Sequence, residues 1–357
     1  MEYEQIEKSR RHRGLTGIVV LVIIIIGGIS WYGYVQQSNA NTSVIEHYPY
    51  AITFDSSSNS LWIVGANYDT SSSTTAIPGI VTKFNVFDAT TTTFSAGVAP
   101  QAVAFDPFTN SVWIANSGAS NITKLNASTG ALIGTYAVGA QPSPSATLQS
   151  SPSAILFEPI TNSVWVTTED SNIVTKLNAS TGVTEGVYTV GTSTIPYEPF
   201  IYPNGIAFDQ RTKSIWVTDR GINSVTKLDV STGVLLGVYA VGKSPYGVAF
   251  DPVTNSVWVA NRDSNTVTKL NAFTGAVDAT YPVGNRPTSV TFDPVTKSVW
   301  VTNYASNNVS KIDVVTGAKT DYPVGYGPTS AAFDPVTNSI WVVNSRSSTI
   351  TRIKIKP

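Results

Sequence analysis

A short phrase recurs seven times along this 357-residue chain and limits the available folds more than any other feature. Its clearest copy is DPVTNSVWVAN at residues 251–261, and every copy carries one tryptophan. Successive tryptophans are 51, 52, 51, 42, 42 and 41 residues apart. They are Trp62, Trp113, Trp165, Trp216, Trp258, Trp300 and Trp341. A period near 42 residues with four strand-like segments per unit is the signature of a β-propeller.

Each unit contains four segments rich in β-branched and aromatic residues, separated by turns of Asn, Ser and Gly. In the fifth unit we expect strands at 246–252, 257–261, 266–271 and 276–284. The sequence therefore predicts an all-β fold, a seven-bladed β-propeller with four-stranded blades, over residues 43–357.

The two ends of the repeat region complement each other. The last unit stops after its third strand, TITRIKIK at 349–356, and lacks a fourth. Residues 43–49, SVIEHYP, precede the first unit and match the fourth-strand pattern. We expect residues 43–49 to be the closing strand of the last blade, because closure leaves no exposed sheet edge.

Two rings of charge recur with the tryptophans. A phenylalanine followed by an acidic residue lies at the start of each phrase, and a basic residue follows the tryptophan by 11 places in six units. These rings have two interpretations: an ion-binding or charge-conducting device, or a strand-end cap and a cross-strand pair that every blade needs. We favour the second, and we expect the Trp and Phe side chains to form the core between blades.

Three insertions interrupt the repeat, at 67–79, 139–153 and 191–204. The first falls between a second and a third strand, and the other two fall between a fourth strand and the next first strand. Because strand direction alternates within a blade, all three are expected on the same face of the propeller. Insertions gathered on one face often mark a binding face, although drift in tolerated surface loops gives the same pattern.

The residue after the proline that opens each first strand differs from unit to unit. We call these seven residues the post-proline residues: Tyr50, Gln101, Ser153, Asn204, Tyr246, Thr288 and Thr329. The first strand of a blade is the innermost, so they are expected to line the central channel. We predict a ligand-binding channel mouth, suited to a polar ligand, with a water-filled channel as the alternative. Its predicted residues are Tyr50, Gln101, Asn204, Tyr246, Glu169, Asp219, Arg220, Arg262, Arg286 and Arg346.

Signals for catalysis are few. Cysteine is absent, and the two histidines are His12, expected in the cytoplasm, and His47, expected on an outermost strand. His-based acid–base chemistry in the channel is therefore not expected, and we predict no cofactor. The low-ranked exception is Ca²⁺ or Mg²⁺ held by Glu169 and Asp219 with oxygens of Asn204, because these cations take oxygen ligands. With a net charge of −1, nucleic acid is not an expected partner.

The N-terminal segment predicts a membrane anchor. Residues 1–14 form a basic tail, and residues 15–35 are apolar and long enough to cross a bilayer as one transmembrane helix. The charge bias places residues 1–14 in the cytoplasm and, after a linker at 36–42, the propeller outside it, at the cell surface or in the periplasm. Two alternatives remain: a secretory signal cleaved before Asn41, and a pilin-like signal cleaved between Gly14 and Leu15.

The phrases VWVANRDSNTVTKLNAFTG and VGNRPTSVTFDP resemble the YVTN-repeat (YncE-like) β-propeller family over residues 43–357. That resemblance implies a seven-bladed ring and a periplasmic or cell-surface location. The chain is also similar to virginiamycin B lyase-like propellers, which use a channel His and Glu with a divalent cation. This sequence offers no channel His, which puts that activity in doubt.

We therefore expect a membrane-anchored binding, recognition or scaffold module whose ligand is a glycan, a peptide or another envelope protein. One alternative is a lyase- or lactonase-like enzyme with a cation in the channel. A second is a filament subunit anchored by residues 15–35.

Overall fold

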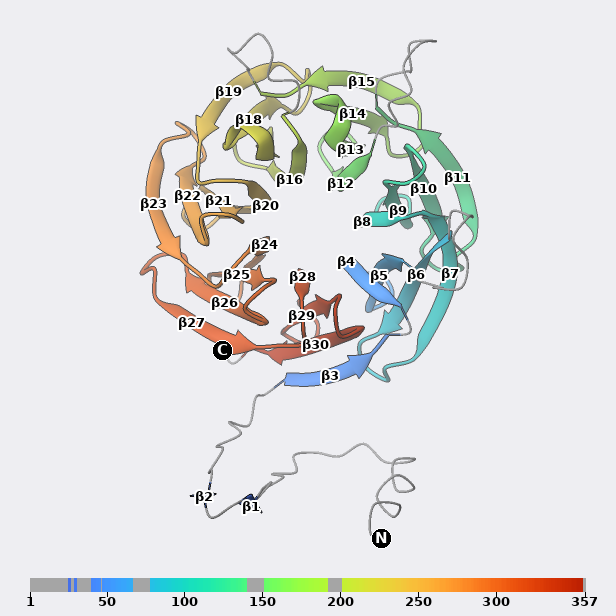
Figure 1. Cartoon of the computed structure of the whole chain (residues 1–357). Helices are drawn as coiled ribbons and strands as arrows, with labels where there is room; N and C mark the ends of the chain where they lie inside the picture. The colour runs from blue at the N-terminus through green and yellow to red at the C-terminus, as the bar shows by residue number, and fades with distance from the viewer. Residues whose placement is uncertain are drawn as a thin grey trace. The chain divides into compact units, whose positions relative to one another are not determined.

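The computed structural model describes residues 25–26, 29–30, 40–45, 47–66, 78–139, 151–191 and 201–355. The chain divides into two compact units, residues 1–39 and 40–357. The second unit contains seven four-stranded antiparallel sheets arranged around a central axis (Figure 1). The prediction of an all-β, seven-bladed propeller with four-stranded blades is confirmed.

The blades follow one another in chain order. Blade 1 consists of β4 (Tyr48–Asp55), β5 (Ser60–Ala66), β6 (Pro78–Asn85) and β7 (Thr91–Val98). Blade 2 consists of β8 (Pro100–Asp106), β9 (Ser111–Asn116), β10 (Asn121–Asn126) and β11 (Leu132–Ala137). Blade 3 consists of β12 (Pro152–Glu158), β13 (Ser163–Thr168), β14 (Ile173–Asn178) and β15 (Thr184–Thr189). Blade 4 consists of β16 (Pro203–Asp209), β17 (Ser214–Asp219), β18 (Ser224–Asp229) and β19 (Leu235–Ala240).

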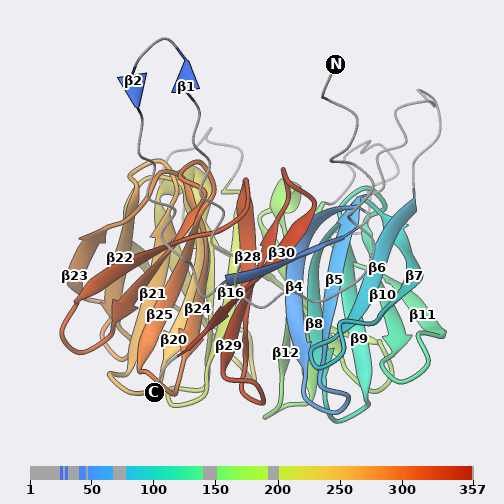
Figure 2. The same ribbon diagram turned by 90° about the horizontal axis from the view of Figure 1, so that it is seen from below.

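The remaining blades repeat the pattern. Blade 5 consists of β20 (Pro245–Asp251), β21 (Ser256–Asn261), β22 (Thr266–Asn271) and β23 (Val277–Pro282). Blade 6 consists of β24 (Pro287–Asp293), β25 (Ser298–Asn303), β26 (Asn308–Asp313) and β27 (Lys319–Pro323). Blade 7 consists of β28 (Pro328–Asp334), β29 (Ser339–Asn344), β30 (Thr349–Lys354) and β3 (Ala40–Val44). The first strand of each blade lies nearest the axis and the fourth lies outermost (Figure 1). Figure 2 shows the inner strands side by side along the axis.

The N-terminal end of the propeller closes the ring, as predicted, but with different bounds. The closing strand is β3, Ala40–Val44, which pairs antiparallel with β30. The predicted range 43–49 is wrong because Tyr48 and Pro49 already belong to the first strand of blade 1. Pro49 is the strand-opening proline of its own unit, so the same residues do not also complete blade 7. Part of the predicted linker at 36–42 therefore lies in a strand.

Seven hydrophobic clusters hold the blades together, and each joins two successive blades. In one of them Trp258 of blade 5 packs with Val299 and Val301 of blade 6. The cluster that closes the ring joins Trp341 of blade 7 to Leu61 of blade 1. The predicted role of the repeated tryptophans as core between blades is therefore confirmed.

The acidic ring caps strand ends. Asp251 is fully buried at the end of β20, and its carboxylate accepts hydrogen bonds from the backbone N–H groups of Val253 (2.8 Å) and Thr254 (3.3 Å). The Thr254 hydroxyl also donates to it, and the indole nitrogen of Trp258 lies 3.5 Å away. The same cap recurs at Asp106, Asp209, Asp293 and Asp334. The carboxylate thereby satisfies turn N–H groups that would otherwise be buried without a partner.

The basic ring forms cross-strand pairs, as the second interpretation predicted. Lys269 on β22 stands opposite Trp258 on β21, and its Nζ lies 5.3 Å from the indole ring centroid. The same Nζ donates to the backbone carbonyl of Val314 in blade 6 at 2.8 Å. A basic side chain over the tryptophan ring recurs in all seven blades. Lys83, Lys124, Lys176 and Lys227 make the same bond to a carbonyl of the next blade, so five of the seven basic residues link neighbouring blades.

The described residues of the N-terminal unit form short strands, whereas the sequence predicted a transmembrane helix. Within the predicted transmembrane segment the described residues are Ile25–Ile26 (β1) and Ile29–Ser30 (β2), which pair as two short antiparallel strands. Among the described residues, no helix has the length and apolar character needed to cross a bilayer. The rest of residues 15–35 and the basic tail at 1–14 lie outside the described residues.

Candidate ligand-binding pocket

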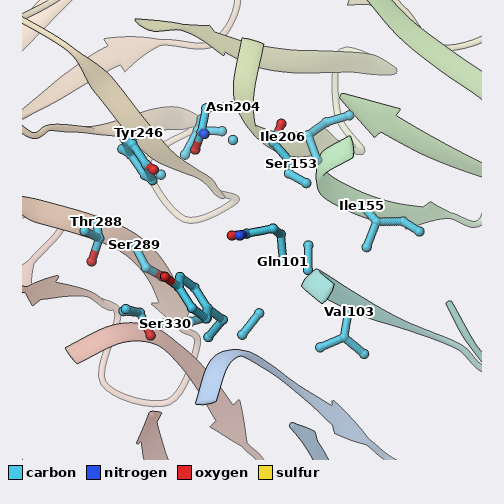
Figure 3. A pocket seen from close by; sticks show the side chains of 18 of the residues that line it. Gln101, Val103, Ser153, Ile155, Asn204, Ile206, Tyr246, Thr288, Ser289 and Ser330 are labelled. Atoms are coloured by element: carbon cyan, nitrogen blue, oxygen red, sulfur yellow. The ribbon is translucent and has the colours of Figure 1, made fainter. Parts of the chain in front are cut away.

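A cavity of about 710 Å³ lies at the centre of the ring, lined by the first strands and by the turns at one end of them. We call this cavity the axial pocket and that end its rim. All seven post-proline residues line it, as expected from their place at the start of the innermost strands. Figure 3 shows five of them, Gln101, Ser153, Asn204, Tyr246 and Thr288, around the open centre.

The pocket changes character along its axis because each first strand contributes three successive residues. The post-proline residues form the outer tier next to the rim. The middle tier is small: Ala51, Ala102, Ala154, Gly205, Gly247, Ser289 and Ser330. The inner tier is aliphatic: Ile52, Val103, Ile155, Ile206, Val248 and Val290. Polar groups are therefore concentrated at the rim, and the deep end is apolar.

The outer-tier residues differ in how far their polar groups are already engaged. The Ser153 hydroxyl lies 2.9 Å from Thr167 Oγ1 and 3.0 Å from the carbonyl of Pro203 in the next blade. The Thr288 hydroxyl similarly lies 2.9 Å from Thr302 Oγ1 and donates to the carbonyl of Pro328 in the next blade at 3.3 Å. These two hydroxyls hold the blades together.

Three other outer-tier side chains are differently placed. Among the described residues, the Gln101 amide, the Asn204 amide and the Tyr246 hydroxyl make no such hydrogen bond, and Gln101 points toward the centre of the pocket (Figure 3). These three groups are therefore left to interact with a ligand or with water.

Three charged residues line the pocket: Glu169, Arg262 and Arg286. A carboxylate oxygen of Glu169 lies 2.7 Å from the Arg220 guanidinium, which stacks on the Tyr202 ring at 5.1 Å. Burial raises the pKa of Glu169, and the charge of Arg220 opposes that rise. The Glu169 charge is thus matched by a cation from the neighbouring blade.

The two lining arginines belong to the side of the rim formed by blades 5 and 6. Arg262 follows β21, and its guanidinium lies over the Tyr246 ring at 5.8 Å. Its nearest acidic oxygen, on Asp263, is 3.6 Å away, which is beyond hydrogen-bond distance. Arg286 lies in the link before β24 and is exposed. Among the described residues, no ion pair or hydrogen bond occupies its guanidinium.

A repeated backbone contact sets the position of these rim residues. In blades 2 to 7, the N–H of the residue after the second strand donates to the carbonyl of the residue before the proline that opens the first strand of the same blade. In blades 5 and 6 these bonds join Arg262 to Ser244 and Tyr304 to Arg286, each at 3.0 Å. Arg286 has a φ of 53°, and the same left-handed conformation occurs at Ser244 and Gly327.

Three predicted mouth residues do not line the axial pocket. Arg220 reaches it through its ion pair with Glu169. Arg346 is exposed, and its side chain lies against Gly327. Asp219 is fully buried, where it accepts hydrogen bonds from Thr226 (2.7 Å) and Ser224 (3.2 Å).

The prediction that places Asp219 at the mouth is therefore wrong. Its carboxyl group is part of the blade interior, and this burial raises its pKa to about 7. The last residue of a second strand lies next to the rim in sequence, but the Asp219 side chain packs inward against β18. Tyr50, Gln101, Asn204, Tyr246, Glu169, Arg262 and Arg286 do line the pocket, and their part in binding stays a prediction.

Two further predictions concern His47 and the insertions. His47 does not lie on an outermost strand: it falls between β3 and β4, is buried, and its Nε2 lies 2.8 Å from Thr82 Oγ1. Burial lowers the pKa of His47 to about 4. The central parts of the three insertions, at 67–77, 140–150 and 192–200, lie outside the described residues, so the predicted place of the insertions on one face stays a prediction.

Several lining residues are absent from the predicted set, and Tyr304 is the largest of those at the rim. Tyr304 follows β25 directly and lines the pocket. It occupies the same place in its unit as Glu169, Arg220 and Arg262, each of which also follows its second strand directly. A comparison of this position across the units, like that of the post-proline position, would have found it.

Comparisons with known proteins agree with the fold. The SMP-30/gluconolactonase/LRE-like region matches residues 160–305, which is less than half of the chain. A streptogramin B lyase structure superposes with a TM-score of 0.69 at 18% identity, covering 88% of this chain and 97% of that one. For virginiamycin B lyase from Staphylococcus aureus the TM-score is 0.71 at 16% identity, covering 89% and 99%. The chain shares its propeller fold with these lyases.

The same fold also serves a different kind of protein. Hydrazine synthase of Kuenenia stuttgartiensis superposes with a TM-score of 0.69 at 16% identity, covering 90% of this chain and 99% of that one. No curated protein shows significant sequence similarity to this chain. At such low identities the likeness establishes the fold, and function has to be argued from the site.

The described residues do not fit the divalent cation that a lyase-like propeller implies. No three His, Cys, Asp or Glu side chains converge as a metal site in the part of the chain that the structure describes. Of the two candidate ligands, Glu169 is paired with Arg220, and Asp219 is enclosed within blade 4. The two carboxyl groups do not meet in the axial pocket, so they do not form a common cation site there.

Proposed function

We propose that this protein is a binding module whose axial pocket takes a polar ligand. The carrying observation is the contrast between two sets of positions. The tryptophans, phenylalanines and strand-end acids repeat in every blade, whereas the seven post-proline residues that converge on one cavity vary. A purely structural position in a symmetric ring would repeat, as those others do. Variation at positions that line a pocket is expected where those residues contact a ligand.

The chemistry of the outer tier supports this proposal. Gln101, Asn204 and Tyr246 supply donors and acceptors at three places around the ring, and Arg262 and Arg286 add charge. Ligand sites in general combine an apolar lining with a few such convergent polar groups. A glycan, a peptide side chain or an envelope-protein segment carries groups of the matching kind.

A ligand screen on the full-length chain tests this function. We expect binding of a member of a glycan, peptide and metabolite collection to raise the midpoint of thermal unfolding. That rise should shrink in Gln101→Ala and Asn204→Ala. The control is Gln210→Ala, an exposed turn residue at the opposite end of the blade, which should behave as wild type. Equal binding by all four proteins would place the ligand elsewhere and reject the axial pocket.

We propose further that residues 15–35 anchor the propeller to a membrane with its pocket outside the cytoplasm, consistent with the resemblance to YVTN-repeat propellers. The apolar length and the basic tail at 1–14 support this proposal. Mass spectrometry of the protein recovered from membranes tests it. An N-terminus at Met1 agrees with an anchor, a start at Leu15 indicates a filament subunit, and a start at Asn41 indicates a released protein.

A lyase or lactonase activity is the second candidate function, supported by the family match over residues 160–305 and by the lyase neighbours. Turnover of gluconolactone or virginiamycin B with added Mg²⁺ or Ca²⁺ tests it. Metal-dependent turnover that is lost in Glu169→Gln would favour the enzyme. We rank this candidate lower because Glu169 and Asp219 do not form a common site.

A further inference from the structure

The charges at the rim are unequally satisfied. One carboxylate oxygen of Glu169 is paired with Arg220, and one oxygen of Asp170 accepts a hydrogen bond from Ser151 at 2.5 Å. Arg262 and Arg286, in contrast, have guanidinium N–H groups with no hydrogen-bond acceptor among the described residues. Such groups are strong donors for carboxylate and phosphate oxygens. Arg262 has only a 3.6 Å ion pair with Asp263, and Arg286 has no ion pair among the described residues, so both arginines offer unoccupied donors at the rim.

The backbone at Arg286 shows that the fold does not require an arginine at this position. Its φ of 53° is a conformation that favours glycine, and glycine stands at the equivalent position, Gly327, in blade 7. The link is fixed by backbone groups alone: the N–H of Arg286 donates to Asn265 Oδ1 at 2.9 Å, and its carbonyl accepts from Tyr304. The same left-handed φ occurs at the equivalent residues Ala99, Tyr202 and Ser244, so the conformation belongs to the fold and does not require an arginine.

We infer that the ligand of the axial pocket is an organic anion, whose carboxylate or phosphate group is bound at the rim by Arg262 and Arg286. This inference rests on the proposed function and adds the charge of the ligand to it. The Arg262 guanidinium lies over the Tyr246 ring at 5.8 Å, and its N–H groups can donate two parallel hydrogen bonds to a carboxylate or phosphate. Gln101 and Asn204, across the outer tier, would meet uncharged polar groups of the same ligand.

Matched pairs of charged and neutral probes test the inference on the full-length protein in detergent. Galacturonate is compared with its methyl ester, and glucose 6-phosphate with glucose, by calorimetric titration. We expect at least one anion to bind roughly 10-fold or more tightly than its neutral partner, as a charge-assisted hydrogen bond predicts. In parallel, the line width of ³⁵Cl⁻ in nuclear magnetic resonance reports anion binding at the rim even when it is weak.

The variants are Arg262→Gln, Arg286→Gln and Arg286→Gly. Each should weaken binding of the anionic probe roughly 10- to 100-fold and reduce the excess chloride line width. Arg286→Gly should also leave the midpoint of thermal unfolding unchanged or higher, because it relieves the backbone at that position. Lys243→Gln is the control, because it removes a positive charge from the corresponding link one blade away, outside the pocket lining.

The outcomes separate this inference from the proposed function. Neutral and charged probes binding equally well would overturn the inference while leaving a ligand pocket in place. Chloride line widths that are the same in Lys243→Gln, Arg262→Gln and Arg286→Gln would also overturn it, whichever organic probes bind. If the pocket variants alter no ligand's binding in the wider screen, the proposed function fails as well.

Discussion

Asp219 stands where four other blades carry asparagine, and the contrast shows the effect of one carboxyl group. In blade 5 the Asn261 amide donates to the Thr268 hydroxyl at 2.8 Å. In blade 4 the direction is reversed, because the hydroxyls of Thr226 and Ser224 donate to Oδ2 of Asp219. Its other oxygen, Oδ1, is buried with no partner among the described residues. The position therefore suits an amide or a protonated acid better than a carboxylate.

In blade 1 the space that the Asn or Asp side chain occupies in blades 2 and 4 to 7 is filled by His47, which lies outside the second strand. The equivalent strand position is Gly65, where a Cβ atom would clash with the His47 Nδ1 atom. The imidazole occupies that space and lies beside Thr82 Oγ1, the counterpart of the Thr268 hydroxyl in blade 5. A histidine 18 residues upstream is not predictable from the repeat, because the unit shows only that a side chain is missing.

Asp219→Asn should change the pH dependence of stability. The folded-state pKa of Asp219 is raised from 3.8 to about 7, so its contribution to the free energy of unfolding is full below pH 3.8 and lost as the pH rises through 7. Between pH 4.5 and 8, we expect the free energy of unfolding of the wild type to fall, relative to that of Asp219→Asn, by on the order of a few kcal/mol. Urea unfolding of both proteins at the two pH values measures this.

Asn261→Asp is the reciprocal control. It should acquire a pH dependence of the same sign, because it places a carboxyl group in the equivalent buried position of blade 5. Titration of His47 contributes equally to all of these proteins and cancels in the differences. Parallel stability curves for wild type and Asp219→Asn would show that the Asp219 carboxyl group is ionised in the folded state at neutral pH.

At the scale of strands and blades, the repeated basic residues act as links. Lys124 is 2% exposed, lies 4.8 Å from the Trp113 ring centroid, and donates to the carbonyl of Ala179 in blade 3 at 2.6 Å. Burial lowers the pKa of its ammonium group. One side chain thus covers the core of its own blade and satisfies a backbone carbonyl of the next.

Lys124→Met should destabilise the propeller by about 2 to 3 kcal/mol, because it removes a charged hydrogen bond and a cation–π contact. Chemical denaturation measures the change in the free energy of unfolding. Lys319→Met, on an exposed outer strand, removes a surface pair with Asp321 and should change it by less than about 0.5 kcal/mol. Equal decreases in the free energy of unfolding in both variants would show that the contact of Lys124 with the next blade does not stabilise the propeller.

The repeat made the regular elements predictable and the exceptions hard to predict. Positions present in seven copies revealed the strands, the caps and the core, since each copy faces the same packing problem. Asp219 and the range 43–49 were misplaced where one unit departs from the others. In the range 43–49, Tyr48 and Pro49 fit both the pattern of a fourth strand and that of a strand-opening proline. The pairing of Ala40–Val44 with β30 shows that the second pattern is the correct one.

At the scale of the whole propeller, closure depends on five paired residues of β3 and β30. Ile45, just after β3, is 3% exposed and packs in the cluster that joins blade 7 to blade 1. Without this segment β30 would be an open edge with unpaired N–H and C=O groups, which is a template for association. The ring therefore holds both ends of the repeat region in one sheet.

Deleting residues 1–45 should lower the midpoint of thermal unfolding by on the order of 10 °C and promote self-association. Deleting residues 1–39, which leaves β3 intact, is the matched control and should leave the midpoint near that of the wild type. Calorimetry and light scattering measure the two effects. Equal midpoints and sizes for the two truncations would show that strand closure is dispensable.

Closure by β3 also fixes the order in which this molecule can be completed during synthesis. Ala40–Val44 leaves the ribosome before any blade, yet its partner β30 begins only at Thr349. At translation rates of roughly 5 to 20 residues per second, β3 waits on the order of 15 to 60 s for that partner. Six blades can form in sequence during that interval, while blade 7 cannot. The earliest strand of the propeller to be made is thus among the last to be folded.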